Sequence, residues 1–201
     1  MLRLEDYKTI FIVVSIVGSL IIASPILASV IPKPATEAFS ELYVLGAGGM
    51  VGGYPTNVEA CETETYKVFL GVGNHLGFSA YYELRVKLRN PNEPLPNSTS
   101  GTPSPLPSIY EKRVILGDNQ TSLMPLHFSF GGLSFNGNSC RVSTISMNNQ
   151  DLSINKTIPW DSEKKAYSFE MFFELWIFDT NSGSFLYHNR FVGFWLNITS
   201  C

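Results

Sequence analysis

Residues 80–88 read AYYELRVKL, and this stretch decides the fold class because apolar and charged side chains alternate strictly along it. In an extended strand four apolar residues share one face and three charged residues share the other: Tyr82, Leu84, Val86 and Leu88 against Glu83, Arg85 and Lys87. A strand with a single apolar face is typical of an antiparallel sheet that packs on a core. The stretch therefore indicates a β domain.

Segments on either side of residues 80–88 read as further strands separated by turn residues. These strands are predicted at 38–45, 65–73, 109–116, 122–130, 167–178 and 185–198. Three longer connections lie between them: a Gly-rich loop at 46–59, a Pro-rich loop at 91–108 and a long insertion at 131–163. A small hairpin across 141–147 and 151–154 fits within the insertion. Seven strands with such spacing predict an all-β fold, an immunoglobulin-like antiparallel β-sandwich. No segment after residue 31 has a helical period.

The N-terminal part of the chain contains a long apolar run, TIFIVVSIVGSLIIASPILASVI, at residues 9–31. Its 23 residues carry no charge. As a helix they would reach about 34 Å, which is enough to cross a hydrocarbon core of about 30 Å. A cleaved signal peptide is the alternative, but its apolar region is normally shorter, about 7–15 residues. We therefore expect a single N-terminal transmembrane helix.

The flanking charges suggest how the chain is oriented. Arg3 and Lys8 precede the run, and only Lys33 follows it before Lys67, which slightly favours an inside N-terminus. The expected organisation is a short cytoplasmic N-terminus at 1–8, a transmembrane helix at 9–31, a linker at 32–37 and an extracellular β-sandwich domain at 38–201. Four N-x-S/T sequons agree with a cell-membrane protein whose C-terminal domain is extracellular, and they are glycosylation candidates: Asn97, Asn119, Asn155 and Asn197.

Successive antiparallel strands reverse direction, so each connection can be assigned to one of the two ends of the sandwich. The short turns 74–78, 117–120 and 179–184 then lie on the membrane side. The long loops 46–64, 91–108 and 131–165 lie on the distal side. The large aromatic residues of these loops are the candidates for ligand contact: Tyr54, Phe135 and Trp160. The alternative is that they plug the end of the sandwich.

Three cysteines are present, Cys61, Cys140 and Cys201, and they form no C-x-x-C motif. In an oxidising exterior one pair would form a disulfide. If the second and fifth strands are neighbours, Cys61 and Cys140 are the favoured pair and Cys201 is unpaired. Three free thiols are the alternative in a reducing compartment.

The sequence shows no arrangement of residues that predicts an enzyme, a cofactor or a metal site. The glycine run at 46–53 departs from the dinucleotide fingerprint at its sixth position, Val51, and no helix start follows. Glu170 and Glu174 would share a strand face about 13 Å apart, too far for a glycosidase pair. The three histidines are scattered, and the net charge of −3 with no basic stripe excludes nucleic acid as a partner.

Two functions remain after these exclusions. The first is a surface-displayed binding or adhesion module that contacts a protein or glycan partner through the distal loops. The second is a structural subunit of a cell-envelope or membrane assembly, because both faces of residues 172–178 are apolar. An enzyme or a metal carrier is a remote third.

Several blocks of this sequence resemble a known family: 39–46 (FSELYVLG), 53–57 (GYPTN), 71–75 (GVGNH) and 82–88. The family consists of archaeal membrane proteins and is called domain of unknown function 1616. Residues 169–178 and 187–196 resemble its final hairpin. The resemblance implies an outward-facing β-sandwich attached to membrane spans, in archaea, with no established activity and no catalytic residues. This chain differs in having one predicted span, Leu76 where an acidic residue often stands, and a large segment at 131–165.

Overall fold

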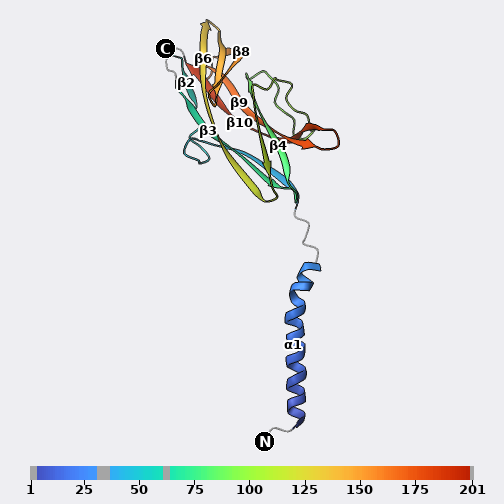
Figure 1. Ribbon diagram of the computed structural model, residues 1–201. Coiled ribbons are helices and arrows are strands. Elements are labelled where there is room, and N and C mark those ends of the chain that lie inside the picture. The colour runs from blue at the N-terminus through green and yellow to red at the C-terminus, as the bar shows by residue number, and fades with distance from the viewer. Residues whose placement is uncertain (1–3, 31–36, 61–63, 200–201) are drawn as a thin grey trace. The chain divides into compact units, whose positions relative to one another are not determined.

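The computed structural model describes residues 4–30, 37–60 and 64–199, and within the helix the side chains of residues 7–22 and 24. The chain forms two compact units, Met1–Ala38 and Phe39–Cys201 (Figure 1). The second unit is called the β domain below.

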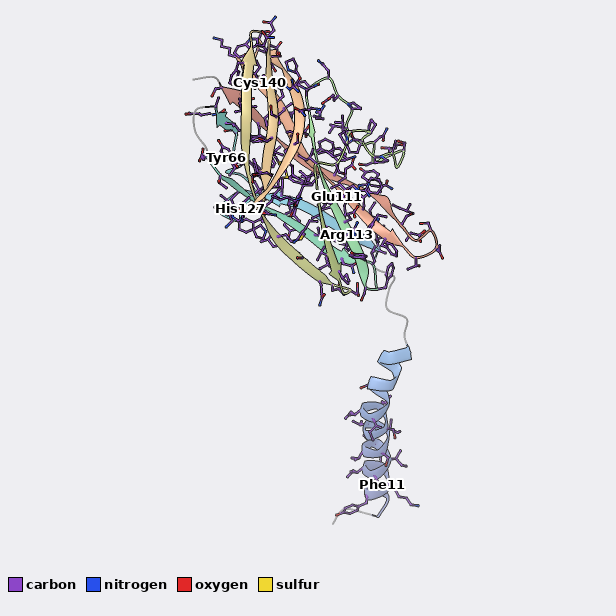
Figure 2. The ribbon with its side chains drawn as sticks, turned by 45° about the horizontal axis from the view of Figure 1, so that its top comes forward. Phe11, Tyr66, Glu111, Arg113, His127 and Cys140 are labelled. Atoms are coloured by element: carbon purple, nitrogen blue, oxygen red, sulfur yellow. The ribbon has the colours of Figure 1, made fainter. Side chains whose placement is uncertain are left out.

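The first unit contains one helix, α1 (Leu4–Val30). Its large apolar side chains are exposed around the helix; Phe11, labelled in Figure 2, is 73% exposed and Leu20 is 65% exposed. No helix among the described residues combines the length and the apolarity that crossing a membrane requires.

The part of the β domain that the structure describes contains ten strands, which alternation and turn residues define. They are β1 (Phe39–Leu45), β2 (Asn57–Glu59), β3 (Tyr66–His75), β4 (Ala80–Arg89), β5 (Tyr110–Leu116), β6 (Gln120–Asn136), β7 (Ser139–Met147), β8 (Gln150–Asp161), β9 (Ala166–Asp179) and β10 (Ser184–Thr199). They form one curled sheet in the order β1-β3-β6-β7-β8-β9-β10-β2, and β4 lies between β9 and β5. Every pair is antiparallel except β10 and β2. The predicted all-β class is confirmed.

The main difference from the predicted strands lies at residues 131–163, which the sequence assigns to a long insertion. In the structure β6 continues through Gly131 and Gly132 to Asn136. The hairpin expected at 141–147 and 151–154 is present as β7 and β8, and both strands are longer than expected. Gly131 pairs with Thr144 and Leu133 pairs with Val142, so the register with β7 is unbroken across Gly132, whose φ is 61°. The two glycines therefore lie inside a continuous strand, where the sequence suggests a loop. This region and β2 raise the number of strands from about seven to ten.

The core lies between the two halves of the curled sheet. Phe128 of β6 and Phe194 of β10 meet there with ring centroids 6.3 Å apart. The predicted apolar face of β4 contributes Tyr82, Leu84, Val86 and Leu88, all of them buried. The predicted strand faces of residues 80–88 are therefore confirmed.

The charged face of β4 is also largely covered, because the Pro-rich segment 90–109 crosses it. Ile109 N donates to Val86 O (2.8 Å), and Lys87 Nζ donates to Ser104 O (2.7 Å). As a result Lys87 is only 3% exposed. Phe172, which pairs with Lys87 in the register of β9, is completely buried by the chain itself. The apolar run at 172–178 therefore belongs to a strand in the middle of the sheet, between β4 and β10.

Candidate functional site

Two of the three predicted contact residues lie together on a third aromatic residue. Phe135 is near the end of β6, and its ring centroid is 5.4 Å from that of Tyr167 on β9. Trp160 on β8 packs edge-on against the same ring at 4.9 Å. Tyr167 itself is buried, and its hydroxyl donates to Gly137 O (2.9 Å). The three rings form one cluster, named here the aromatic cluster.

The outer members of the aromatic cluster are partly exposed, 42% for Trp160 and 37% for Phe135. Trp160 pairs with Tyr167 across β8 and β9, and Phe135 precedes the tight β6–β7 turn at Gly137. Both side chains are therefore supported by strands on a buried ring. Aromatic side chains held in this way offer contact area at little conformational cost.

A groove of about 300 Å³ lies beside Trp160. Its other walls are Pro91, Asn92, Pro159, Asp161, Ser162 and Glu163. Asp161 Oδ1 accepts hydrogen bonds from the backbone N–H groups of Glu163 (2.9 Å) and Lys164 (3.1 Å), which fixes the turn after β8. The groove thus combines one aromatic side chain with carboxylate, amide and hydroxyl groups.

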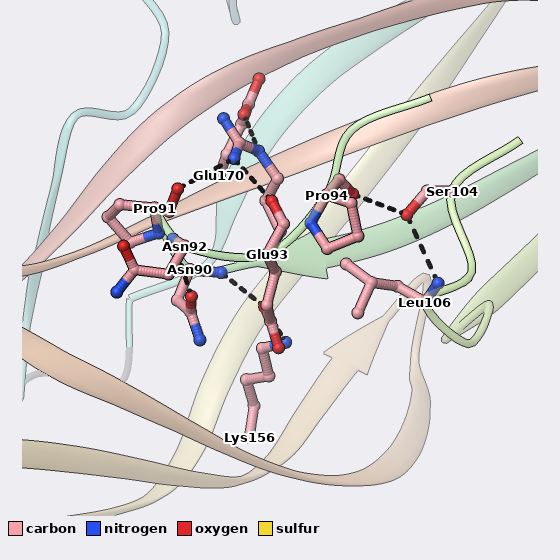
Figure 3. A network of polar contacts seen from close by, with 10 residues as sticks. Asn90, Pro91, Asn92, Glu93, Pro94, Ser104, Leu106, Lys156 and Glu170 are labelled. Atoms are coloured by element: carbon pink, nitrogen blue, oxygen red, sulfur yellow. Dashed lines mark hydrogen bonds and ion pairs between the residues drawn. The ribbon is translucent and has the colours of Figure 1, made fainter. Parts of the chain in front are cut away.

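The Pro91–Asn92 wall of the groove is held by a network of polar contacts (Figure 3). Arg89 Nε donates to Glu170 Oε2 (2.6 Å), and Arg89 Nη1 donates to the carbonyl oxygens of Pro91 (3.4 Å) and Glu93 (3.0 Å). The Glu93 carboxylate accepts from Asn90 N (2.7 Å) and pairs with Lys156. This network ties the Pro-rich segment to β4, β8 and β9, so the wall is preorganised.

Tyr54, the third predicted contact residue, is not part of this cluster. Its ring stacks on Phe194 with centroids 5.8 Å apart, and its hydroxyl donates to Val44 O (3.0 Å). Tyr54 is half-buried and packs against the core. Tyr54 is thus a packing residue, as in the alternative interpretation, and whether it also contacts a ligand stays a prediction.

The carboxylates considered for catalysis are both engaged in ion pairs. Glu170 accepts from Arg89, and Glu174 Oε2 lies 3.0 Å from Lys87 Nζ. Trp176 Nε1 also donates to Glu174 Oε2 (3.0 Å). Their observed partners explain both carboxylates as structural groups.

A buried polar network that sequence reasoning missed joins four strands. His188 Nε2 lies 2.8 Å from Ser40 Oγ, Ser40 Oγ lies 2.7 Å from the Tyr82 hydroxyl, and that hydroxyl donates to Asn74 Oδ1 (3.0 Å). Burial and the nearby Arg190 charge lower the pKa of His188. Ser40 is only 2% exposed, so a substrate would not reach its hydroxyl. No local signal could reveal this network, because His188 and Ser40 are 148 residues apart.

The other two histidines lie elsewhere. His75 stacks on Phe39 with centroids 4.7 Å apart, and His127, labelled in Figure 2, is exposed as its strand position predicts. Within the described ranges, no three His, Cys, Asp or Glu side chains are grouped so that they could hold a metal ion.

The sequons differ in their surroundings. Asn97, Asn119 and Asn155 are exposed. Asn197 is half-buried in β10, and its Oδ1 accepts a hydrogen bond from Ser168 Oγ (2.7 Å). Cys140 is buried on β7, and no described cysteine is bonded to its thiol. The predicted pairing of Cys61 with Cys140 stays a prediction, since Cys61 and Cys201 lie outside the described residues.

The strands and the groove define a β domain with a preorganised aromatic surface. A comparison with family models assigns the chain to a family. The chain belongs to the family described as Domain of unknown function (DUF1616), whose model matches residues 32–144. This confirms the resemblance to the domain of unknown function over residues 32–144. The groove residues 159–163 lie beyond the matched part. No curated protein matches the chain.

Two similar solved structures are of the β-glucosidase from Listeria innocua. The complex with glucose has 8% identity and a TM-score of 0.39 to this chain, and covers 83% of this chain and 17% of that one. The complex with isofagomine has the same identity and TM-score, and covers 84% and 17%. The chain thus spans about one sixth of that enzyme's length.

Proposed function

We propose that this chain is a binding module that takes a neutral glycan at the groove beside Trp160. The observation that carries the proposal is the partly exposed Trp160 ring, 42% exposed, beside a groove lined by Asn92, Asp161 and Glu163. A sugar ring has an apolar C–H face and a rim of hydroxyl groups. Trp160 offers the apolar contact, and the carboxylate and amide oxygens accept hydrogen bonds from hydroxyl donors.

The size and charge of the groove narrow the ligand class. A volume of about 300 Å³ is at the lower end for small-ligand sites, which suits one ring-sized group at a time. The lining of the groove carries two carboxylates, Asp161 and Glu163, and Lys164 Nζ lies 3.9 Å from Asp161 Oδ2. An anionic sugar would meet net repulsion there. A neutral glycan is therefore the better fit.

The test is binding of the full-length chain in nanodiscs to an array of neutral glycans. We expect the wild-type chain to bind at least one glycan, and Trp160→Ala and Asn92→Ala each to weaken that binding at least about tenfold, which is about 1.4 kcal/mol. The matched control is Phe78→Ala, which removes another exposed aromatic ring, 59% exposed, at the opposite end of β4. Equal binding by Trp160→Ala and the wild type, or no binding by the wild type, contradicts the proposal.

We further propose that the apolar run anchors the module in a cell membrane, with the N-terminus inside and the β domain outside as an immunoglobulin-like scaffold. The 23-residue charge-free run and the apolar side chains exposed around α1 support this, because a helix that is apolar all round needs an apolar surrounding. The double variant Val13→Arg and Val17→Arg should release the chain from membranes in alkaline carbonate, whereas Tyr7→Arg, outside the run, should not. Wild-type chain in the carbonate supernatant contradicts this proposal.

A further inference from the structure

The end of the β domain opposite the aromatic cluster has a different surface chemistry. The turns after β3 and β5 meet there, since Gly77 N donates to Asp118 Oδ1 (2.8 Å) and Asn119 N donates to Asn74 O (2.7 Å). Four large apolar side chains from separate segments are exposed at this end: Phe39 (43%), Phe78 (59%), Ile115 (71%) and Leu186 (47%). They are called the apolar rim below.

A pocket of about 550 Å³ opens beside the apolar rim, lined by residues 78–81, 177–180 and Leu186. Two aromatic residues of the lining, Tyr81 and Phe178, pack together with Phe185. The ring centroid of Tyr81 lies 5.1 Å from that of Phe185 and 6.0 Å from that of Phe178, and the last two are 5.3 Å apart. Apolar side chains thus form most of the wall, and Ser79, Asp179 and Thr180 supply the polar groups.

A cationic group accompanies these rings. The Arg113 guanidinium lies over the Phe185 ring, 5.1 Å from its centroid, and the side chain is 53% exposed. It is also paired with Glu83 at 2.7 Å, which keeps it in place. Aromatic side chains beside an arginine are the combination that favours the boundary between lipid headgroups and acyl chains.

The course of the chain indicates which partner contacts this surface. The β domain begins at the apolar rim, because Phe39 is the first residue of β1 and its ring stacks on His75. Only eight residues, 31–38, separate Phe39 from Val30, the last residue of α1. A chain of that length reaches at most about 30 Å when fully extended. A bilayer that held the apolar run would therefore be within covalent reach of the apolar rim.

From these observations we infer that the apolar rim rests in the headgroup–acyl boundary of the membrane and that the pocket beside it receives a lipid acyl chain. The inference depends on the proposed membrane anchoring. It assigns the two ends of the β domain different partners, lipid at the apolar rim and a glycan at the aromatic cluster. Exposed apolar patches of this kind are typical of contact surfaces.

The test uses the full-length chain in phosphatidylcholine vesicles whose acyl chains carry bromine, a quencher of tryptophan fluorescence. Phe78→Trp adds a reporter at the rim, and Met50→Trp adds the matched control at another exposed apolar position, 72% exposed, in the loop after β1. The three native tryptophans give the baseline. We expect the emission added at position 78 to be mostly lost in brominated vesicles relative to unbrominated ones, and the emission added at position 50 to be kept.

Flotation of the same vesicles separates this inference from the anchoring on which it depends. If the chain does not float, both are overturned. If it floats and position 78 is quenched no more than position 50, the inference at the rim fails while the anchoring stands. Leu186→Trp is the second reporter should Phe78→Trp not fold, and the same quenching is expected there.

Discussion

The Nζ of Lys87 lies 3.0 Å from Oε2 of Glu174, and the two side chains are only 4% and 0% exposed. The Pro-rich segment completes the arrangement, because Lys87 donates to Ser104 O (2.7 Å) and Ser104 N donates to Glu174 Oε1 (2.8 Å). A buried charge without its partner is costly, whereas the intact pair roughly balances its own desolvation. The pair therefore determines how the segment is fixed on the outer face of β4 and β9.

Lys87→Met should destabilise the β domain by about 3–5 kcal/mol, because it leaves the Glu174 carboxylate buried and unpaired. The free energy of unfolding in urea measures this. Lys112→Met is the matched control, since Lys112 is exposed on β5, and a change within about 0.5 kcal/mol is expected there. Equal effects of the two variants would show that the buried pair is not formed.

The double variant Lys87→Met and Glu174→Leu should be more stable than Lys87→Met alone, because it removes the orphaned carboxylate as well. Full recovery is not expected, since the N–H groups of Ser104 and Trp176 lose their acceptor. Faster hydrogen exchange in residues 103–106 should accompany both variants. A double variant less stable than the single one contradicts this account of the pair.

Gly46→Ala tests whether the glycine run is a fixed turn. A Cβ at Gly46 would lie 2.1 Å from Gly52 O and 2.8 Å from Gly53 O, which are backbone atoms. We expect a loss of about 1–3 kcal/mol in the free energy of unfolding. Gly48→Ala is the matched control, because its nearest neighbour is the flexible end of Met50 at 3.9 Å, and it should change little. A neutral Gly46→Ala would mean that residues 46–53 move freely.

The sequence predicts those parts of the fold that depend on local patterns. Alternation along residues 80–88 assigns both faces of β4, because the period of two is a property of the strand alone. Gly131 and Gly132 mislead, since a glycine pair reads as a loop whether it ends a strand or lies within one, and only the partner strand β7 decides between the two. The burial of Lys87 depends on Ser104, which no pattern along β4 contains.

The candidate site shows the same division between local and distant information. Phe135 and Trp160 can be selected as large aromatics in a segment expected at one end, and both reach the surface. Tyr54 meets the same criterion yet packs on Phe194, because the glycine run folds back toward β1. What joins Phe135 and Trp160 is Tyr167, whose position beside both depends on strand register. Register is a property of the pairing between strands, and local patterns along a single strand do not reveal it.

Glycan attachment should distinguish the four sequons if the chain is made in a host that modifies them. Asn97, Asn119 and Asn155 are exposed and should be modified. Asn197 should stay unmodified once the sheet has formed, because it is half-buried beside Ser168 and pairs with Asn57 of β2. Peptide mass spectrometry after enzymatic deglycosylation measures the occupancy of each site. High occupancy at Asn197 would mean that β10 joins β2 only after modification.

Cys140 supplies a prediction about pH. Its side chain is completely buried, and burial raises the pKa of the thiol to about 11. In the unfolded chain the pKa is near its ordinary value, about 8.5. The folded state therefore binds the proton more tightly, and its advantage is complete below about pH 8.5 and is lost as the pH rises toward 11. The free energy of unfolding should fall over that interval by up to about 1.4 kcal/mol per pH unit from this thiol.

Cys140→Val isolates the contribution, because valine fills a similar volume and carries no titratable group. The free energies of unfolding of the wild type and Cys140→Val are compared in urea under reductant. Their difference should be constant below about pH 8.5. Above that pH the wild type should lose stability relative to Cys140→Val. Alkylation by iodoacetamide at pH 8 should likewise be slow in the folded chain and fast in denaturant, since the thiolate is the reactive form. If folded and unfolded chains are alkylated at the same rate, Cys140 is accessible and β7 is not packed against the core as described.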